Sequence, residues 1–249
     1  MEERRPGLST MRILEGKGVT KSFGGLAAIS KVDFHVDRGE IVGLIGPNGA
    51  GKTTLFNLIS AAISVDSGEI GFKGKRISGL KSYQVCRTGV ARTFQSVRVF
   101  PNLSVHQNVT LGSIFGTSSG MSPAEANKEA LALLEFVGLS LPGTTLAKDL
   151  TLAQQKRLEV ARALATKPEL LLLDEVIAGL NPTETSEAME LVTRVRQRGV
   201  TIMMIEHVMK AIMSICDRII VLHHGVKIAE GTPKEIVTNR TVIEVYLGE

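Results

Sequence analysis

The chain has 249 residues, of which 43% are hydrophobic and 22% are charged, and its formal net charge is +4. These values are ordinary for a globular protein, and the longest apolar runs are far shorter than the ~20 residues that cross a bilayer. No basic leader precedes an apolar segment of signal-peptide length, so we expect a cytosolic protein. Cys86 and Cys216 form no paired pattern and are expected to be reduced structural thiols.

The first third of the chain is patterned mainly for β-structure around one glycine-rich loop. Apolar and polar residues alternate over much of it, which is typical of half-buried strands. We predict, in order, a flexible polar tail at 1–10, strands between 13 and 36, a turn at Arg38-Gly39, a buried strand at 41–45, the glycine-rich loop, a helix and a hairpin at 68–77. One domain is expected to cover residues 11–249.

The rest of the chain is first helical and then alternates between strands and helices. We predict a helix-rich block at 82–165 with a loop at 116–123, then a strand at 170–174, a helix at 184–198, a strand at 200–205, a helix at 207–215 and a strand at 219–222. Such alternation predicts a mostly parallel sheet with both faces covered. The helical block is interpreted as an insertion between the two halves of one α/β core.

The glycine-rich loop matches the phosphate-binding pattern G-x4-G-K-[ST]. Its glycines allow backbone N–H groups to curl around phosphate oxygens, and the N-terminus of the next helix adds its positive end. Lys52 is expected to reach the β- and γ-phosphates, and the Thr53 hydroxyl is expected to ligate Mg²⁺. The candidate nucleotide-binding residues of this loop are Gly46, Pro47, Asn48, Gly49, Ala50, Gly51, Lys52, Thr53 and Thr54.

Two adjacent carboxylates close the apolar run LLLLDE at residues 170–175. A continuous apolar run is typical of a strand that is buried on both faces. Asp174, at its carboxyl end, can hold Mg²⁺ through water, and Glu175 can polarise the water that attacks a γ-phosphate. Ordinary solvated acids at a strand end are the alternative, which the phosphate-binding loop makes less attractive.

Three further side chains are candidates because of where they stand. Gln95 ends the strand-like piece ARTFQ, and its amide could touch both a metal ion and the attacking water. His207 follows the apolar strand in MMIEHV and is placed to contact a γ-phosphate, while Phe23 could stack on adenine. Each residue has an ordinary alternative: a lone Gln is usually on the surface, a lone His packs or caps a helix, and a lone Phe is part of the core.

The order of these motifs resembles the ATP-binding cassette of ABC transporters over nearly the whole chain after the tail. In that family, a helix that starts with an LSGGQ-like motif lies just ahead of the catalytic strand, as LTLAQ (150–154) does here. The resemblance implies that Thr151, Ala153 and Gln154 contact ATP bound by the second cassette of a head-to-tail dimer. Thr151 and Ala153 depart from the usual Ser and Gly, although a hydroxyl and a backbone N–H remain for phosphate binding.

The resemblance also implies the fold class, the ligands and the division of roles. The fold would be an α/β P-loop cassette with a mostly parallel core sheet, an antiparallel β subdomain and an inserted helical subdomain at about 96–160. ATP and Mg²⁺ would be bound. The implied metal-holding residues are Thr53, Gln95 and Asp174, and the implied catalytic residues are Glu175, His207 and Gln95.

Three stretches are similar to the larger ATPase subunit of branched-chain amino acid importers: KSFGGLAAISKVDFHVDRGEIVGLIGPNGAGKTTLFNLISA, RTFQSVRVFPNLSVHQNVTLG and KIAEGTPKEIVTNRTVIEVYLGE. This similarity implies uptake of branched-chain or other hydrophobic amino acids. The implied partners are two transmembrane permease subunits, a second ATPase subunit (identical or paralogous) and a periplasmic or extracellular binding protein, with no nucleic acid. The chain would lie peripherally on the cytoplasmic face of the membrane, and residues 98–114 would dock a helix of a membrane subunit.

Other classes stay open at this point. The cassette of an exporter or of a lipid-transport complex fits the same motifs. A soluble ABC ATPase acting on nucleic acid or ribosomes is disfavoured by the single phosphate-binding loop, and a small-molecule kinase is disfavoured because no acceptor domain is evident. His223 and His224 are interpreted as a hairpin turn, and Lys156, Arg157 and Arg162 as the solvated side of a helix.

Overall fold

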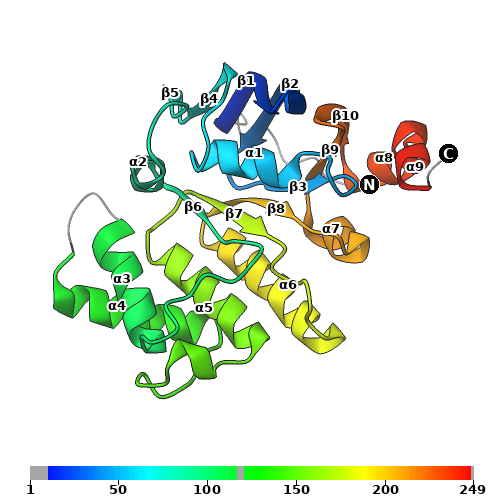
Figure 1. Cartoon of the computed structure of the whole chain (residues 1–249). Coiled ribbons are helices and arrows are strands. Elements are labelled where there is room, and N and C mark those ends of the chain that lie inside the picture. The colour runs from blue at the N-terminus through cyan, green and yellow to red at the C-terminus, as the bar shows by residue number, and fades with distance from the viewer. Residues whose placement is uncertain (1–10, 117–120, 248–249) are drawn as a thin grey trace.

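The computed structural model describes residues 11–116 and 121–247. The predicted tail at 1–10 and residues 117–120 of the predicted loop at 116–123 therefore lie outside the described residues. Two β-sheets and the helices around them make up the described part (Figure 1).

The smaller sheet is antiparallel, with the order β2-β1-β4-β5. Its strands are β1 Arg12–Phe23, β2 Leu26–Asp37, β4 Ser67–Phe72 and β5 Lys75–Arg76. The alternating segment predicted at 13–36 is thus a hairpin, in which Gly24 and Gly25 take the positive φ values of the turn. The second predicted hairpin, at 68–77, is also confirmed, because β4 and β5 pair there.

The larger sheet has the order β10-β9-β3-β8-β7-β6. Five of its strands run parallel and β10 pairs with β9 in the antiparallel sense, which confirms the predicted mostly parallel sheet. The strands are β3 Ile41–Ile45, β6 Val90–Arg92, β7 Leu170–Asp174, β8 Thr201–Ile205, β9 Arg218–His223 and β10 Val226–Gly231. His223 and His224 stand at the β9–β10 turn, as predicted.

The larger sheet divides the hydrophobic core into two clusters, one on each face. Along β7, Leu170 and Leu172 belong to the cluster shared with the antiparallel sheet, whereas Leu171 and Leu173 belong to the cluster under the other helices. Successive side chains of a strand point to opposite faces, so a strand covered on both sides must be apolar throughout. This explains the leucine run ahead of Asp174.

Helix α1 lies between the two sheets, and α5 and α6 cover the opposite face of the larger sheet (Figure 1). Helices α3 and α4 pack beside α5, while α8 and α9 end the described chain near β10. The helices are α1 Lys52–Ile59, α2 Ser82–Thr88, α3 Val105–Gly116, α4 Pro123–Phe136, α5 Leu152–Leu164, α6 Pro182–Gln197, α7 Met209–Ile215, α8 Pro233–Thr238, α9 Arg240–Leu247 and the single 3₁₀ turn Ala147–Asp149.

Two helices begin at other residues than predicted, and a capping box explains the first difference. Helix α6 begins at Pro182, two residues earlier than predicted, because the Asn181 side chain accepts the Glu184 N–H and forms a capping box. Helix α7 begins at Met209, so His207 lies in the loop ahead of the helix, where it is free to contact other side chains.

The prediction that Lys156 lies on a solvated face of α5 was wrong. Lys156 is only 8% exposed, and its ammonium group binds the backbone carbonyls of the loop after β7. Arg162 donates to the carbonyl oxygen of Arg98. At Lys156, helix α5 is therefore covered by the loop after β7, whereas Arg162 is only partly buried.

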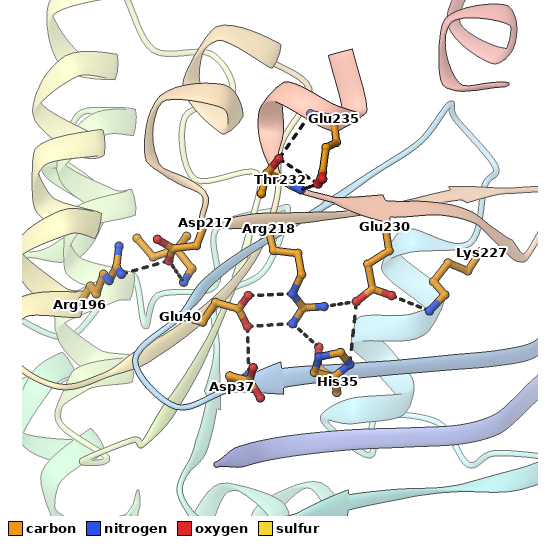
Figure 2. Close-up of polar contacts among 11 residues, drawn as sticks. His35, Asp37, Glu40, Arg196, Asp217, Arg218, Lys227, Glu230, Thr232 and Glu235 are labelled. Carbon is orange, nitrogen blue, oxygen red and sulfur yellow. Dashed lines mark hydrogen bonds and ion pairs between the residues drawn. The ribbon is translucent and has the colours of Figure 1, made fainter. Parts of the chain in front are cut away.

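An ion-pair network joins β2, β9, β10 and the turn just before β3 (Figure 2). The Arg218 guanidinium binds both carboxylate oxygens of Glu40 at 2.8 Å, donates to the carbonyl oxygen of His35 at 2.9 Å and pairs with Glu230. Glu230 also pairs with Lys227 at 2.6 Å. This arrangement anchors the C-terminal strand and helices to the core.

Substitution of Arg218 by Ala should lower the free energy of unfolding by about 3 kcal/mol, because Glu40 and Glu230 lose the cation they share. Arg240→Ala is the control, since that side chain is 93% exposed and its pair with Glu244 should contribute less than about 1 kcal/mol. Urea unfolding of both variants measures the difference. If Arg218→Ala and Arg240→Ala lowered the free energy of unfolding equally, the network would not anchor the C-terminal segment.

Candidate functional site

The two candidate carboxylates, the candidate glutamine and the candidate histidine lie where neighbouring parallel strands end. Gln95 follows β6, Asp174 ends β7, His207 follows β8, and the loop at 46–54 follows β3. Strands β3, β8, β7 and β6 are neighbours and run in the same direction, so the loops at their carboxyl ends share one edge of the sheet. Ligands of open α/β sheets bind at that edge.

The loop at 46–54 is held closely against the surrounding backbone. A Cβ atom on Gly46 would lie 2.1 Å from the carbonyl oxygen of Leu222, and one on Gly51, whose φ is +101°, would lie 2.5 Å from that of Ala28. Both positions therefore require glycine. Gly225, in the β9–β10 turn, donates to the carbonyl oxygen of Ala50 at 3.1 Å.

Lys52 begins α1 and is buried beneath this loop. Its ammonium group donates to the carbonyl oxygens of Gly46 at 2.6 Å and Pro47 at 2.9 Å. Burial lowers the pKa of Lys52, and the charges of Glu175 and Asp174 act in the opposite direction. The side chain is thus a cation already located between the loop and the two carboxylates, with donors that can be transferred to phosphate oxygens.

Asp174 is fully buried at the end of β7. One of its oxygens, Oδ2, pairs with the Arg92 guanidinium at 2.8 Å, and its backbone N–H donates to Thr93 Oγ1 at 3.1 Å. Burial raises the pKa of Asp174, and Arg92 counters this effect. The other oxygen, Oδ1, is buried without a hydrogen-bond partner in the described part of the chain. Such an acceptor suits a cation or water bound to a cation.

Glu175 lies at the centre of three converging side chains. Its Oε1 accepts a hydrogen bond from Gln95 Nε2 at 3.1 Å and lies 2.9 Å from His207 Nε2. The residue has a φ of +53°, a left-handed conformation that is unfavourable for a side chain other than glycine. The structure therefore brings together Gln95, Glu175 and His207, which the sequence placed at three separate strand ends.

The remaining candidate residues lie outside this contact group. Phe23 ends β1 and is 51% exposed. Thr151 caps α5 by accepting the Gln154 N–H, and Gln154 accepts the Thr151 N–H in return. Ala153 is buried and lies on the wall of a cavity between α5 and α6. None of the described hydrogen bonds joins Thr151, Ala153 or Gln154 to the phosphate-binding loop.

Four charged residues at the site were missed by the sequence reasoning. Arg92 pairs with Asp174, and Glu159 accepts the backbone N–H groups of Phe94 and Arg98 on either side of Gln95. Lys156 and Glu206 bind the loop after β7. The available signal was their spacing: Arg92 lies three residues before Gln95, and Glu206 stands directly before His207.

A groove of about 740 Å³ opens beside Gln95. Its walls carry aromatic rings from Phe94 and Phe100, with the guanidinium groups of Arg98 and Arg162 lying over them at 4.5 and 5.3 Å. Helix α3 and α5 form its floor through Gly112 and Ala163 among others. The groove thus combines aromatic surface with two cationic groups.

Two other kinds of feature are absent from the described residues. No group of three or more His, Cys, Asp or Glu side chains is placed to hold a metal ion. No helix in the described ranges has the length and apolar character needed to cross a membrane.

Glu206 is a buried carboxyl group with a raised pKa. It is 3% exposed, and burial raises its pKa from 4.5 to about 7, although the N–H groups of Ile177 and His207 and the charge of Lys156 favour its ionised form. The negative charge of Glu175 adds to the effect of burial.

Comparisons with known proteins converge on one family. The sequence model of the family described as ABC transporter matches residues 29–178, and that of the branched-chain amino acid ATP-binding cassette transporter matches residues 226–249. The high-affinity branched-chain amino acid transport ATP-binding protein LivG of Escherichia coli K12 is 42% identical, over 95% of this chain and 98% of that protein.

Solved structures agree with this. A nucleotide-free ATP-binding cassette of an ABC transporter superposes with a TM-score of 0.86 at 30% identity, covering 96% of this chain and all of that one. A dimeric ATP-binding cassette in a post-hydrolysis state, bound to ADP and Pi, gives 0.79 at 27% identity, covering 88% and 98%.

The raised pKa of Glu206 predicts the sign of a pH effect on stability. Between about pH 4.5 and 7 the folded chain holds a proton that the unfolded chain releases, so this residue makes stability fall as pH rises through that range. Glu206→Gln should remove the effect and gain stability relative to the unaltered chain, on the order of 3 kcal/mol at pH 8. Urea unfolding from pH 5 to 8 measures it, with the exposed Glu135→Gln on α4 as control. If the free energies of unfolding of Glu206→Gln and Glu135→Gln differed by the same amount at every pH from 5 to 8, the raised pKa of Glu206 would be contradicted.

Proposed function

The chain belongs to the ABC transporter family of ATP-binding cassettes, and from that premise we propose that it is the ATP-hydrolysing subunit of an importer of branched-chain or other hydrophobic amino acids. The observation that carries this proposal is the arrangement at Glu175, whose carboxylate lies between Gln95 and His207 and close enough to Lys52 for the two charges to interact.

In this proposal the loop at 46–54 binds the phosphates of ATP. Its backbone N–H groups and the start of α1 provide the anion site, and Lys52 turns from the carbonyls of Gly46 and Pro47 to the β- and γ-phosphates. Phe23 offers an exposed ring for the adenine.

Mg²⁺ fits the residues that would hold it. The unpartnered Oδ1 of Asp174, the exposed Thr53 and the Gln95 amide are oxygen donors of the kind this ion prefers. When bound, the ion would neutralise charge on the β- and γ-phosphate oxygens. Arg92 holds the other oxygen of Asp174, which fixes the direction in which Oδ1 points.

The hydrolytic step then follows from the position of Glu175. A water molecule held by its carboxylate attacks the γ-phosphorus, its proton passes to Glu175, and the bond to the bridging oxygen breaks to give ADP and inorganic phosphate. His207 orients the carboxylate and lies where it can contact the γ-phosphate, while Gln95 orients the water. Water exclusion would come from a second cassette.

We further propose that two cassettes, identical or paralogous, pair head to tail. The dimeric relative bound to ADP and Pi supports pairing in general. Thr151 and Gln154, at the exposed start of α5, would contact the ATP of the second cassette, through a helix N-terminus that favours phosphate. Because Ala153 is packed against the inside of its own chain, its methyl group would crowd that contact less than the sequence suggests.

The groove beside Gln95 is proposed as the docking site for a cytoplasmic helix of a membrane subunit. It lies next to the nucleotide site, and its aromatic walls and arginines suit an amphipathic helix with a carboxylate. The other proposed partners are a second permease subunit and a binding protein outside the membrane, and the chain would then be peripheral on the cytoplasmic face. Support for the amino acid substrate comes from the match at residues 226–249 and from LivG.

Glu175→Gln should keep ATP binding and lower turnover at least ~10²-fold, because an amide does not accept the proton of the attacking water. ATP should then trap dimers that are visible by size-exclusion chromatography. Glu187→Gln, on the exposed side of α6, is the matched control and should hydrolyse ATP normally. Unaltered turnover in Glu175→Gln would rule out the assigned base.

Arg98→Glu should reduce uptake by the reconstituted transporter while ATP hydrolysis by the isolated chain stays close to normal, because the side chain lines the groove and its backbone keeps the contact with Glu159. Lys128→Glu, exposed on α4, controls for the change of charge. Crosslinking of the membrane subunit only to β9 and β10 would contradict this docking site.

A further inference from the structure

Resting on the proposed function, we propose that Lys156 and Glu206 are positioning residues that hold the loop after β7 from two sides, and so fix Glu175 in the conformation in which it activates water. Neither residue would touch ATP. Both would act through the backbone of residues 175–178.

Lys156 binds the carbonyl side of this loop. Its ammonium group donates to the carbonyl oxygens of Glu175 and Ala178, both at 2.7 Å. These two carbonyls lie three residues apart, so a single side chain from α5 closes the turn that follows the catalytic carboxylate. Charge-assisted bonds of this kind are stronger than those between neutral groups.

Glu206 binds backbone N–H groups on the other side of this loop. Its Oε1 accepts the Ile177 N–H at 3.0 Å, and its carboxylate also accepts the backbone N–H of His207. One buried carboxylate therefore joins the loop that follows Glu175 to the residue whose ring contacts Glu175 Oε1 at 2.9 Å. We therefore expect the contact between Glu175 and His207 to loosen when this link is removed.

The two charges also stabilise each other across the loop. Burial lowers the pKa of Lys156, and the negative charge of Glu206 opposes this more strongly than those of Glu175 and Glu159. A buried ammonium and a buried carboxylate are each costly alone, and here the peptide groups of the loop lie between them with carbonyls toward the cation and N–H groups toward the anion. The peptide groups of the loop thus compensate both buried charges.

Glu175 needs such support because its backbone is strained. With φ at +53°, the residue has a conformation that persists only where the surroundings determine it, and its N–H donates to the carbonyl oxygen of Ile205 at 2.9 Å. The bonds from Lys156 and Glu206 act on the following residues, so together the three contacts fix both sides of the strained position. Without them, Glu175 would relax while the phosphate-binding loop stayed in place.

The test is steady-state hydrolysis of ATP with Mg²⁺ at pH 8 by the full chain, together with calorimetry of ATP binding and thermal unfolding. Lys156→Met should lower kcat by ~10- to 100-fold and leave KM and the Kd for ATP nearly unchanged, because misplacement of the base affects the chemical step alone. Lys156→Arg should recover most of the rate, since a guanidinium can donate to both carbonyls. Lys128→Met on α4 is the control.

Glu206→Gln removes one of the two carboxylate oxygens that can accept hydrogen bonds, and the variant should still fold. It should be as stable as the unaltered chain or more stable, and still have a kcat several-fold to ~10-fold lower. Glu135→Gln should behave as the unaltered chain. A stable but slower variant separates positioning from a simple loss of folding.

The possible failures are distinct. Normal kcat in Lys156→Met and Glu206→Gln, with normal turnover by the unaltered chain, would overturn this inference alone. Equal losses in Lys156→Met and Lys156→Arg would also overturn it, because the donated hydrogen bonds would then not matter. An unaltered chain that binds ATP without hydrolysing it would overturn the proposed function and this inference together.

Discussion

The placement of two adjacent carboxylates at the end of a fully buried strand is the constraint on which the rest of the site depends. Asp174 and Glu175 would repel each other and lose solvation there, so each needs compensating partners. Arg92 pairs with Asp174, Gln95 and His207 contact Glu175, and Lys52 acts on both. These partners come from the ends of three strands, β6, β8 and β3, which a parallel sheet brings to the same edge as the end of β7.

The same constraint explains how the rest of the fold is arranged. Because β7 is covered on both faces, one face packs against α1 and the antiparallel sheet and the other against α5 and α6. Helix α5 consequently runs beneath the catalytic edge with its start exposed, and Lys156, one turn along, reaches the loop behind Glu175. The groove beside Gln95 is lined by the other end of α5, by α2 and α3 and by the segment around Arg98, so a partner bound there would lie against elements that also contact the site.

The sequence predicted much of this site, for physical reasons that apply residue by residue. The phosphate-binding loop has a fixed spacing of glycines and Lys52, and LLLLDE has the composition of a doubly covered strand, so both could be recognised locally. Gln95 and His207 were found through their order along the chain. By contrast, Arg92, Glu159, Lys156 and Glu206 act through contacts between residues 19 to 82 positions apart. Nothing local distinguishes a charged helix residue that faces solvent from Lys156, which binds a backbone loop, and that prediction was wrong.

Calorimetric titration of ATP with Mg²⁺ into the purified chain and into its Lys52→Ala variant tests the central claim most directly. The account predicts saturable binding to the unaltered chain and at least tenfold weaker binding to Lys52→Ala, because the ammonium group is the cation that the loop offers to the β- and γ-phosphates. Thermal unfolding of the variant in the absence of nucleotide should confirm that the loop remains folded after it loses the bonds to Gly46 and Pro47. Equal affinity in a folded Lys52→Ala variant would contradict the account, because ATP would then bind somewhere other than this loop.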